Sequence, residues 1–438
     1  MLDNLRGNCM VEETLTTRLG LRRWFWIQLV VQEILLIIGR GFLPTTGSRE
    51  SVILMKAGLS VCIVFNLLGL VLLSSNEERL SSLHWFKRFL YRFNHYGQAF
   101  IQTVTIIVVL GVWTRIFVSS WHVNANIVTG AVLLLLLVAY IPAGIFAYGR
   151  VQSLVGRIVI IFVLAFGLVC DSPDLVTGAF QSSLSSVVKS LVTSGVAGAV
   201  IFAVMTGFTM VTWSFRLPRF GFSRTSQWWV IAIMALFCVA FMLFNAFDAG
   251  TSFSTLWKFD FRMKAPTVNM MLNGLAPGIV EEWMVRFVIL GLLMKALQYR
   301  QHQFGWAVAI SSILFGLFHF SNLIGQSLTA TIEQALSAGS LGCLFAALYL
   351  YTRALWWPML FHFGVDSLAF MSSGSQTMSK PGMFDWWITI IESVIFIGLA
   401  VFLLTGKRGR NAKRNFREFS GDGLMFTGSL ARQTYPTR

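Results

Sequence analysis

Two adjacent glutamates and an arginine interrupt an otherwise apolar run of the chain. The segment reads Glu281-Glu282-Trp-Met-Val-Arg286 and continues Phe-Val-Ile-Leu-Gly-Leu-Leu. Glu282 and Arg286 are four residues apart with the acid first, so on a helix they share a face in the orientation that favours an ion pair. Glu281 lies about 100° round the helix and is not satisfied by that pair in the same way. A carboxylate at membrane depth costs several kcal/mol unless it is partnered, so this cluster indicates a functional site.

Two imidazoles and a further carboxylate follow in later apolar segments. The run Phe315-Gly-Leu-Phe-His319 lies near the end of one segment, and Pro358-Met-Leu-Phe-His362-Phe-Gly-Val-Asp366 lies in another. His362 and Asp366 share one helix face. If three helices bring these groups to one cavity, they supply a base, a group that holds a water molecule and donors for a developing oxyanion. Water-dependent amide hydrolysis needs these three functions.

Each cluster also has a structural interpretation. An ion pair that joins helices explains Glu282 and Arg286 equally well, and a lone histidine such as His319 more often bonds between helices than catalyses. The coincidence of three polar clusters favours a shared site.

The three clusters, in this order, resemble the motifs Glu-Glu-x-x-x-Arg, Phe-x-x-x-His and His-x-x-x-Asn/Asp of a known family. This is the family of CAAX-processing and bacteriocin-processing (CPBP or Abi) intramembrane glutamic endopeptidases, which include the Ras-converting prenyl-protein proteases. The resemblance covers about residues 270–370. It implies that Glu282 with Arg286 fixes the helix and tunes the site.

The same resemblance assigns roles to the other four site residues. It implies that Glu281 and His319 activate the attacking water, and that His362 and Asp366 bind the oxyanion or orient the groups that do. Many family members carry Asn at the last position, whose amide can donate a hydrogen bond, whereas an ionised Asp366 would repel an oxyanion. Either Asp366 is protonated or it holds His362 as an imidazolium-like donor, and the sequence leaves both open.

The resemblance points to a metal-free glutamate enzyme without a cofactor. Zinc held by Glu281, His319 and His362 is the alternative, because these side chains are good zinc ligands. The sequence has no His-Glu-x-x-His zinc helix, no Gly-x-Ser-Gly serine-protease loop and no Gly-x-Gly-Asp aspartyl motif.

Composition places these residues in a membrane protein. Hydrophobic residues make up 55% of the chain and charged residues only 12%, which is about half of what a soluble domain carries. The net charge of +15 comes from Lys and Arg in loops and tails beside apolar stretches, so we expect no nucleic-acid partner. The five cysteines have no paired spacing and predict neither a disulfide nor a zinc framework.

The apolar stretches predict an all-α polytopic transmembrane bundle of about twelve spans with a C-terminal Abi/CAAX-protease-like core. Basic residues favour alternate loops, which predicts a multi-pass protein of the cell membrane with both termini cytoplasmic. The family resemblance favours a bacterial host. The predicted spans are 24–39, 52–74, 97–118, 127–148, 154–170, 191–213, 228–247, 270–297, 304–320, 334–352, 356–372 and 384–405.

Polar residues divide the chain into an N-terminal helical bundle at 1–250, a protease-like core at 265–405 and a basic tail at 406–438. The loop 248–268 is the best boundary. Helix interiors before it are expected to hold almost no polar groups, whereas 270–370 holds many.

Several isolated charged and titratable residues receive structural explanations. Glu33 is expected near a span end, where it can reach the interface, and His95 in a loop. Glu333 is expected to begin a helix or loop. Glu392 is a single acid within the last span.

The leading functional hypothesis is an endopeptidase that acts on a hydrophobic or lipidated peptide or protein entering from the membrane lipid. The alternative is a non-catalytic scaffold or regulator whose N-terminal bundle binds a membrane partner, such as a cell-envelope enzyme or a sensor. A transporter with an intramembrane charge relay is a third reading, but no inverted repeat is visible.

Overall fold

The computed structural model describes residues 15–16, 18–42, 49–74, 82–375 and 377–419. These residues form helices and no β-strand, which confirms the predicted all-α class. Long apolar runs favour helices in a membrane because a helix satisfies its backbone polar groups internally.

The N-terminal half contains elongated helices, several of which pass into π-helical or 3-10 turns. Their bounds are α1 Leu19–Gly41, α2 Arg49–Ser74, α4 Trp85–Arg115, η1 Ile116–Ser120, α5 Ala125–Ala143, η2 Gly144–Tyr148, α6 Leu154–Val159, η3 Ile160–Val169, α7 Ser172–Thr177, η4 Gly178–Ser183, α8 Ser186–Thr193 and α9 Val196–Thr212.

The C-terminal half begins with α10 and ends with a short basic helix. Its elements are α10 Trp228–Phe247, α11 Val268–Glu282, η5 Trp283–Ile289, α12 Leu290–Ala296, α13 Gln303–Phe318, η6 His319–Ile324, α14 Leu328–Thr352, α15 Trp356–Ser373, α16 Met383–Leu404 and α17 Gly406–Phe419.

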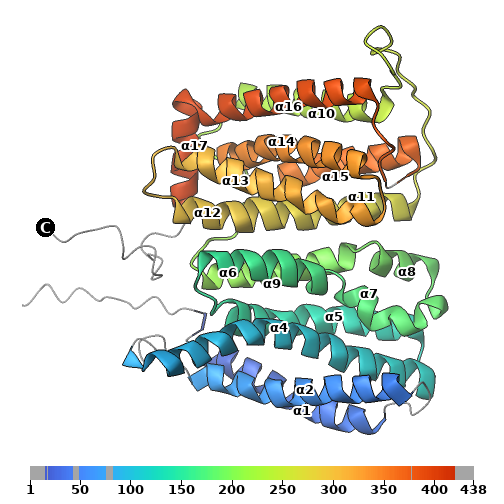
Figure 1. Ribbon diagram of the computed structural model, residues 1–438, viewed down its shortest axis with the longest axis vertical. Coiled ribbons are helices and arrows are strands. Elements are labelled where there is room, and N and C mark those ends of the chain that lie inside the picture. The colour runs from blue at the N-terminus through green and yellow to red at the C-terminus, as the bar shows by residue number, and fades with distance from the viewer. Residues whose placement is uncertain (1–14, 17, 43–48, 75–81, 376, 420–438) are drawn as a thin grey trace, which may run out of the picture.

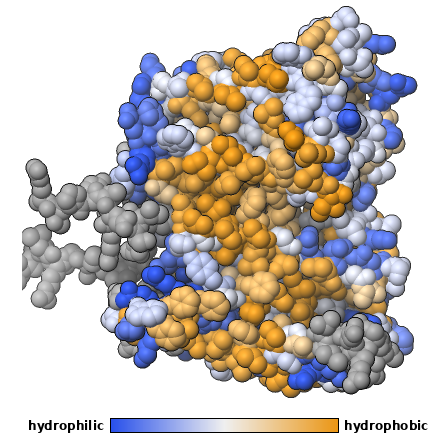
Figure 2. Space-filling model, viewed as in Figure 1, coloured by the Kyte–Doolittle hydropathy of each residue, from blue (hydrophilic) through white to orange (hydrophobic). Residues whose placement is uncertain are grey.

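Most helices run roughly side by side in stacked layers (Figure 1). The layers follow the chain from α1, α2 and α4 at one edge, through α5, α6 and α9, to α11–α15, with α10 and α16 at the opposite edge. The visible face carries an apolar band across the middle of the helices and hydrophilic residues at their two ends (Figure 2). This distribution is typical of a bundle that spans a bilayer.

The number of spans is not confirmed. Every predicted span overlaps a helix, although 191–213 is broken at residues 194–195. Within the described part of the chain, seven helices are long and apolar enough to cross a membrane. The number is eight if the bent pair Ser186–Thr193 and Val196–Thr212 counts as one span. Gln303–Ile324, which carries His319, is one of these seven. The segment Val268–Ala296 and α15, which carry the other site residues, are not among them.

Buried amides join α1, α2 and α4, so the expectation of almost no polar groups within these helices was wrong. Asn66 donates to Glu33 Oε2 at 3.1 Å, and Gln102 donates to Asn66 Oδ1 at 3.2 Å. Gln102 also donates to Gln98 Oε1 at 3.0 Å, and both glutamines are fully buried. Uncharged amides interrupt an apolar run less visibly than charges do, and interhelical hydrogen bonds of this kind stabilise membrane bundles.

Three isolated residues therefore have different surroundings from those expected. Glu33 lies inside α1 with Asn66 as its partner, not at a span end. His95 is 3% exposed within α4, not in the loop expected for it. Glu333 is buried in the second turn of α14 and accepts from Thr389 of α16 at 2.7 Å, so it joins two helices.

The C-terminal helices pack directly on the N-terminal ones. Helix α9 lies against α11, and Trp283 Nε1 donates to Thr206 Oγ1 at 2.9 Å. One hydrophobic cluster contains residues from both sides, including Phe202 and Phe287. The loop 248–267 is non-helical, but α10 before it packs against α15. The division of the chain at 250 therefore stays a prediction.

Glycines bring the helices of the C-terminal half close together. A Cβ added at Gly278 of α11 would lie 3.0 Å from the carbonyl oxygen of Met359 in α15. A Cβ added at Gly316 of α13 would lie 2.5 Å from the carbonyl oxygen of Ala335 in α14. Small residues allow such approach where lipid provides no hydrophobic force between helices.

We predict that Gly316→Ala destabilises the protein by about 1–3 kcal/mol, because the added methyl overlaps the backbone of α14. Thermal unfolding of the purified protein in detergent, followed by tryptophan fluorescence, measures the loss. Gly398→Ala in α16 is the control, since a Cβ there meets nothing within 4 Å. Equal unfolding temperatures for the two variants would contradict the close packing of α13 on α14.

Candidate active site

The adjacent glutamates lie where an α-helix changes into a π-helix. Glu281 and Glu282 are the last residues of α11, and Arg286 lies in the π-helical segment η5 that follows. Pro277 lies one turn earlier within α11. Short π-helical segments are rare and occur frequently at functional sites, since they change the direction in which side chains project.

Glu282 and Arg286 form the predicted ion pair in the protein interior. Arg286 Nε lies 3.0 Å from Glu282 Oε2, and both side chains are 0% exposed. The guanidinium carbon lies 4.3 Å from the ring centroid of Phe315 and 5.3 Å from that of Phe345. Aromatic faces attract a cation, so the two rings add to the carboxylate in holding Arg286.

The other oxygen of Glu282 holds His362. Glu282 Oε1 lies 2.9 Å from His362 Nδ1 in a buried hydrogen bond between α11 and α15. A carboxylate oxygen accepts, so the Nδ1–H group of His362 is the donor in this bond. Both oxygens of Glu282 are therefore engaged, and the second imidazole nitrogen, Nε2, points away from this carboxylate.

The Nε2 atom of His362 faces the two remaining carboxylates. It lies 3.5 Å from Asp366 Oδ2 and 3.9 Å from Glu281 Oε2. The Glu281 distance is longer than a direct hydrogen bond. Glu281 Oε2 has no hydrogen-bond partner among the described residues. The side chains of Glu281 and Asp366 are 13% and 25% exposed, in contrast to Glu282.

His319 lies at the junction of α13 and η6, beside this cluster. Its Nδ1 lies 2.9 Å from the carbonyl oxygen of Phe315. Because a carbonyl only accepts, Nδ1 carries the proton, and in the neutral ring Nε2 is free to act as a base. The Phe315 ring lies edge-on to both imidazoles, with centroids 4.9 Å from His319 and 6.3 Å from His362.

The structure thus brings five predicted site residues within hydrogen-bond or ion-pair distance of one another. The sixth, His319, lies beside them, because the Phe315 ring contacts both His319 and His362. Glu281, Glu282 and Arg286 come from α11 and η5, and His362 and Asp366 from α15. The catalytic roles of these residues stay predictions. Within the described ranges, no three His, Cys, Asp or Glu side chains are grouped as metal ligands. Metal analysis of the purified protein is the test of the zinc alternative.

Sequence reasoning overlooked the aromatic residues that support the site. Phe345 of α14 lies against both Arg286 and His362, and nothing in its apolar surroundings distinguishes it in the sequence. Phe315 belongs to the Phe-x-x-x-His motif, so the sequence pointed to it. Its contact with Arg286 could not be predicted from spacing along the chain. The bond between Glu282 and His362 also joins residues 80 positions apart.

Helices at membrane depth bury the Glu282 carboxylate between the Arg286 guanidinium and the His362 imidazole. The chain is therefore a polytopic membrane protein with a polar site inside the membrane. Comparison with known proteins identifies the segment that carries it. Residues 263–368, about a quarter of the chain, match the family model described as type II CAAX prenyl endopeptidase Rce1-like. This match confirms the resemblance inferred from the three motifs. No curated protein and no solved structure gave a significant match.

We predict that Glu282→Gln destabilises the fold by roughly 3–5 kcal/mol, because it leaves the Arg286 charge buried without a counter-charge. Thermal unfolding in detergent measures the loss. The double variant Glu282→Leu with Arg286→Leu removes both charges and should recover much of the stability.

The exposed pair Asp260 and Arg262, whose atoms lie 2.5 Å apart outside the bundle, provides the control. Arg262→Gln should change the unfolding temperature little, because water screens that pair. A double variant as unstable as Glu282→Gln would show that Glu282 does not act through Arg286.

Proposed function

We propose that the protein is an intramembrane endopeptidase in which Glu281 activates water. The observation that carries the proposal is the difference between the adjacent glutamates. Glu282 is fully buried, with Oε2 3.0 Å from Arg286 Nε and Oε1 2.9 Å from His362 Nδ1. The Glu281 side chain is 13% exposed, and its Oε2 lies 3.9 Å from His362 Nε2, farther than a hydrogen bond. A general base must be accessible and close to the water that it deprotonates. The Rce1-like match at 263–368 supports peptide-bond hydrolysis.

In the proposed reaction, Glu281, assisted by His319 Nε2, takes a proton from water, and the hydroxide attacks the carbonyl carbon of the scissile bond. The resulting oxyanion accepts a hydrogen bond from Nε2–H of a protonated His362. The carbon–nitrogen bond then breaks, and the proton held by Glu281 goes to the leaving amine. Asp366, 3.5 Å from His362 Nε2, favours the protonated imidazole.

The proposed substrate is a hydrophobic or lipidated peptide, or the lipidated end of a protein, that enters from the membrane lipid. The matched family is named for prenylated CAAX substrates. A buried site within helices at membrane depth suits a chain end that a lipid brings to the bilayer. The match does not favour the alternative of a non-catalytic scaffold that binds a cell-envelope partner.

Removing the base should abolish processing without unfolding the protein. Glu281→Gln and His319→Ala are each expected to slow hydrolysis by about 10²–10⁴-fold, the usual contribution of a general base. Comparing the envelope proteins and released peptides of cells that carry each variant or the wild type identifies the substrate and measures the loss.

Glu392→Gln is the matched control for these variants. It neutralises a carboxylate on α16 within the same bundle, but Glu392 is not part of the site. Its processing should equal that of the wild type. Unchanged processing in a folded Glu281→Gln protein would exclude the proposed mechanism.

Asp366 variants test whether Asp366 positions His362. If it does, Asp366→Asn should keep more activity than Asp366→Leu, since its amide oxygen can face Nε2–H as Oδ2 does at 3.5 Å. Asp366→Leu, which cannot accept, should lose at least about tenfold in kcat, because each oriented donor at an oxyanion contributes 10²–10³-fold. Cleavage of the identified substrate by purified variants measures both. Equal activity of the Leu and Asn variants would contradict a positioning role.

A further inference from the structure

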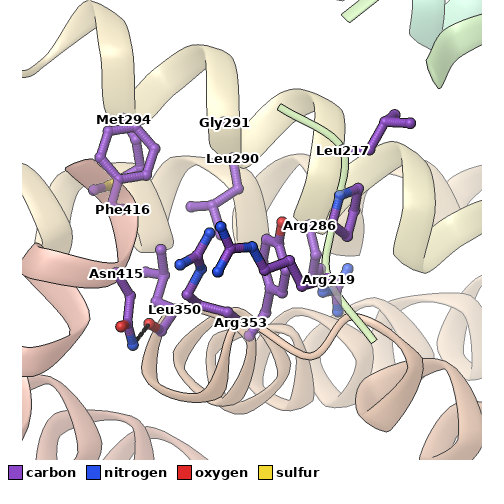
Figure 3. A pocket seen from close by; sticks show the side chains of 12 residues that line it. Leu217, Arg219, Arg286, Leu290, Gly291, Met294, Leu350, Arg353, Asn415 and Phe416 are labelled. Carbon is purple, nitrogen blue, oxygen red and sulfur yellow. Dashed lines mark hydrogen bonds between the residues drawn. The ribbon is translucent and has the colours of Figure 1, made fainter. Parts of the chain in front are cut away.

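Three arginines, Arg219, Arg286 and Arg353, line one pocket (Figure 3). Arg219 comes from the loop after α9, Arg286 from η5 and Arg353 from the end of α14. Arg219 is exposed, Arg353 is 9% exposed and Arg286 is 0% exposed. The arginines therefore extend from the surface into the interior, around a narrow hollow that is partly open to solvent.

The buried end of this pocket offers hydrogen-bond donors that the protein does not use. Nη1 and Nη2 of Arg286 are buried and have no hydrogen-bond partner among the described residues, because the ion pair with Glu282 uses Nε. No carboxylate is among the described residues that line the pocket. Buried guanidinium N–H groups without a partner are costly, and an anion would satisfy them.

Hydrogen bonds between separate segments build the pocket walls. Arg219 forms an isolated backbone bridge with Ala354, which places it beside the end of α14. Asn415 of α17 donates to the carbonyl oxygen of Tyr351 at 2.7 Å and accepts from Ser223 at 2.6 Å. These contacts hold the loop, α14 and α17 together. The pocket is thus a built site and not a chance gap between mobile side chains.

The other lining residues and the location indicate the kind of anion. Leu290, Met294, Leu350 and Phe416 give the pocket an apolar wall beside its arginines. The pocket lies at the end of the bundle where α17 packs against α14, and α17 is rich in Lys and Arg. Clusters of basic residues at a membrane surface attract anionic lipids, and arginine geometry matches phosphate oxygens.

We propose that this pocket binds a phosphate group, supplied by the headgroup of an anionic phospholipid in the leaflet at the basic end of the bundle. The guanidinium groups contact the phosphate, and the apolar wall contacts the adjoining glycerol and acyl carbons. This site shares Arg286 with the candidate active site, but lipid binding there does not depend on proteolysis.

The test uses the full-length protein in nanodiscs of phosphatidylcholine alone or mixed with phosphatidylglycerol. Phosphatidylglycerol should raise the unfolding temperature of the wild type, because a ligand that binds only the folded state stabilises it. Arg219→Gln should weaken the apparent affinity for phosphatidylglycerol by about tenfold, the loss expected for one charge-assisted hydrogen bond.

Arg224→Gln is the matched control, since Arg224 is exposed in the same loop but does not line the pocket. It should keep the affinity of the wild type. An equal loss in both variants would mean that general surface charge binds the lipid and would overturn the proposal. Absence of any stabilisation by phosphatidylglycerol would overturn it as well.

Inorganic phosphate added to the protein in phosphatidylcholine nanodiscs distinguishes the two sources of phosphate. Little stabilisation by phosphate supports the lipid, because only the lipid also contacts the apolar wall. Stabilisation equal to that by phosphatidylglycerol, and lost in Arg219→Gln, would overturn the assignment to a lipid in favour of a soluble phosphate.

Discussion

The organisation of the site depends on one buried carboxylate, that of Glu282. Taking an ion out of water costs several kcal/mol, and partners in good geometry must offset that cost. Arg286 on one oxygen and His362 on the other supply those partners, at 3.0 and 2.9 Å. Arg286 comes from η5 and His362 from α15. The buried Glu282 carboxylate needs both partners, so it holds these two elements against each other.

This constraint separates two glutamates that are chemically identical and adjacent in sequence. Glu282 is held in the interior, and the bond that holds it also sets the tautomer and direction of His362. Glu281, one position earlier, projects to a different side, where it meets the free nitrogen of that imidazole and is partly exposed. In the proposed reaction, the buried Glu282 fixes the position of the imidazole that Glu281 faces.

The other helices of the bundle pack closely although lipid provides no hydrophobic force between them. Glycines such as Gly278 and Gly316 let backbones approach, and the side-chain amides of Asn66 and Gln102 link α1, α2 and α4. Trp283, next to Glu282, bonds to Thr206 of α9. The N-terminal helices thus reach the site element directly, so they support the site and are not merely an attachment to it.

The sequence alone predicted the helical class and the membrane setting, and it singled out the polar residues that the structure brings together, because each depends on local composition or on spacing along a helix. Long apolar runs predict helices, and polar residues within them are rare enough to stand out. Spacing also predicted the pair of Glu282 and Arg286. Only the tertiary structure decided the partner of His362, the aromatic contacts of Arg286 and the buried amides of the N-terminal helices. Those contacts join residues far apart in the chain, and their energies depend on distances and burial that no local pattern encodes.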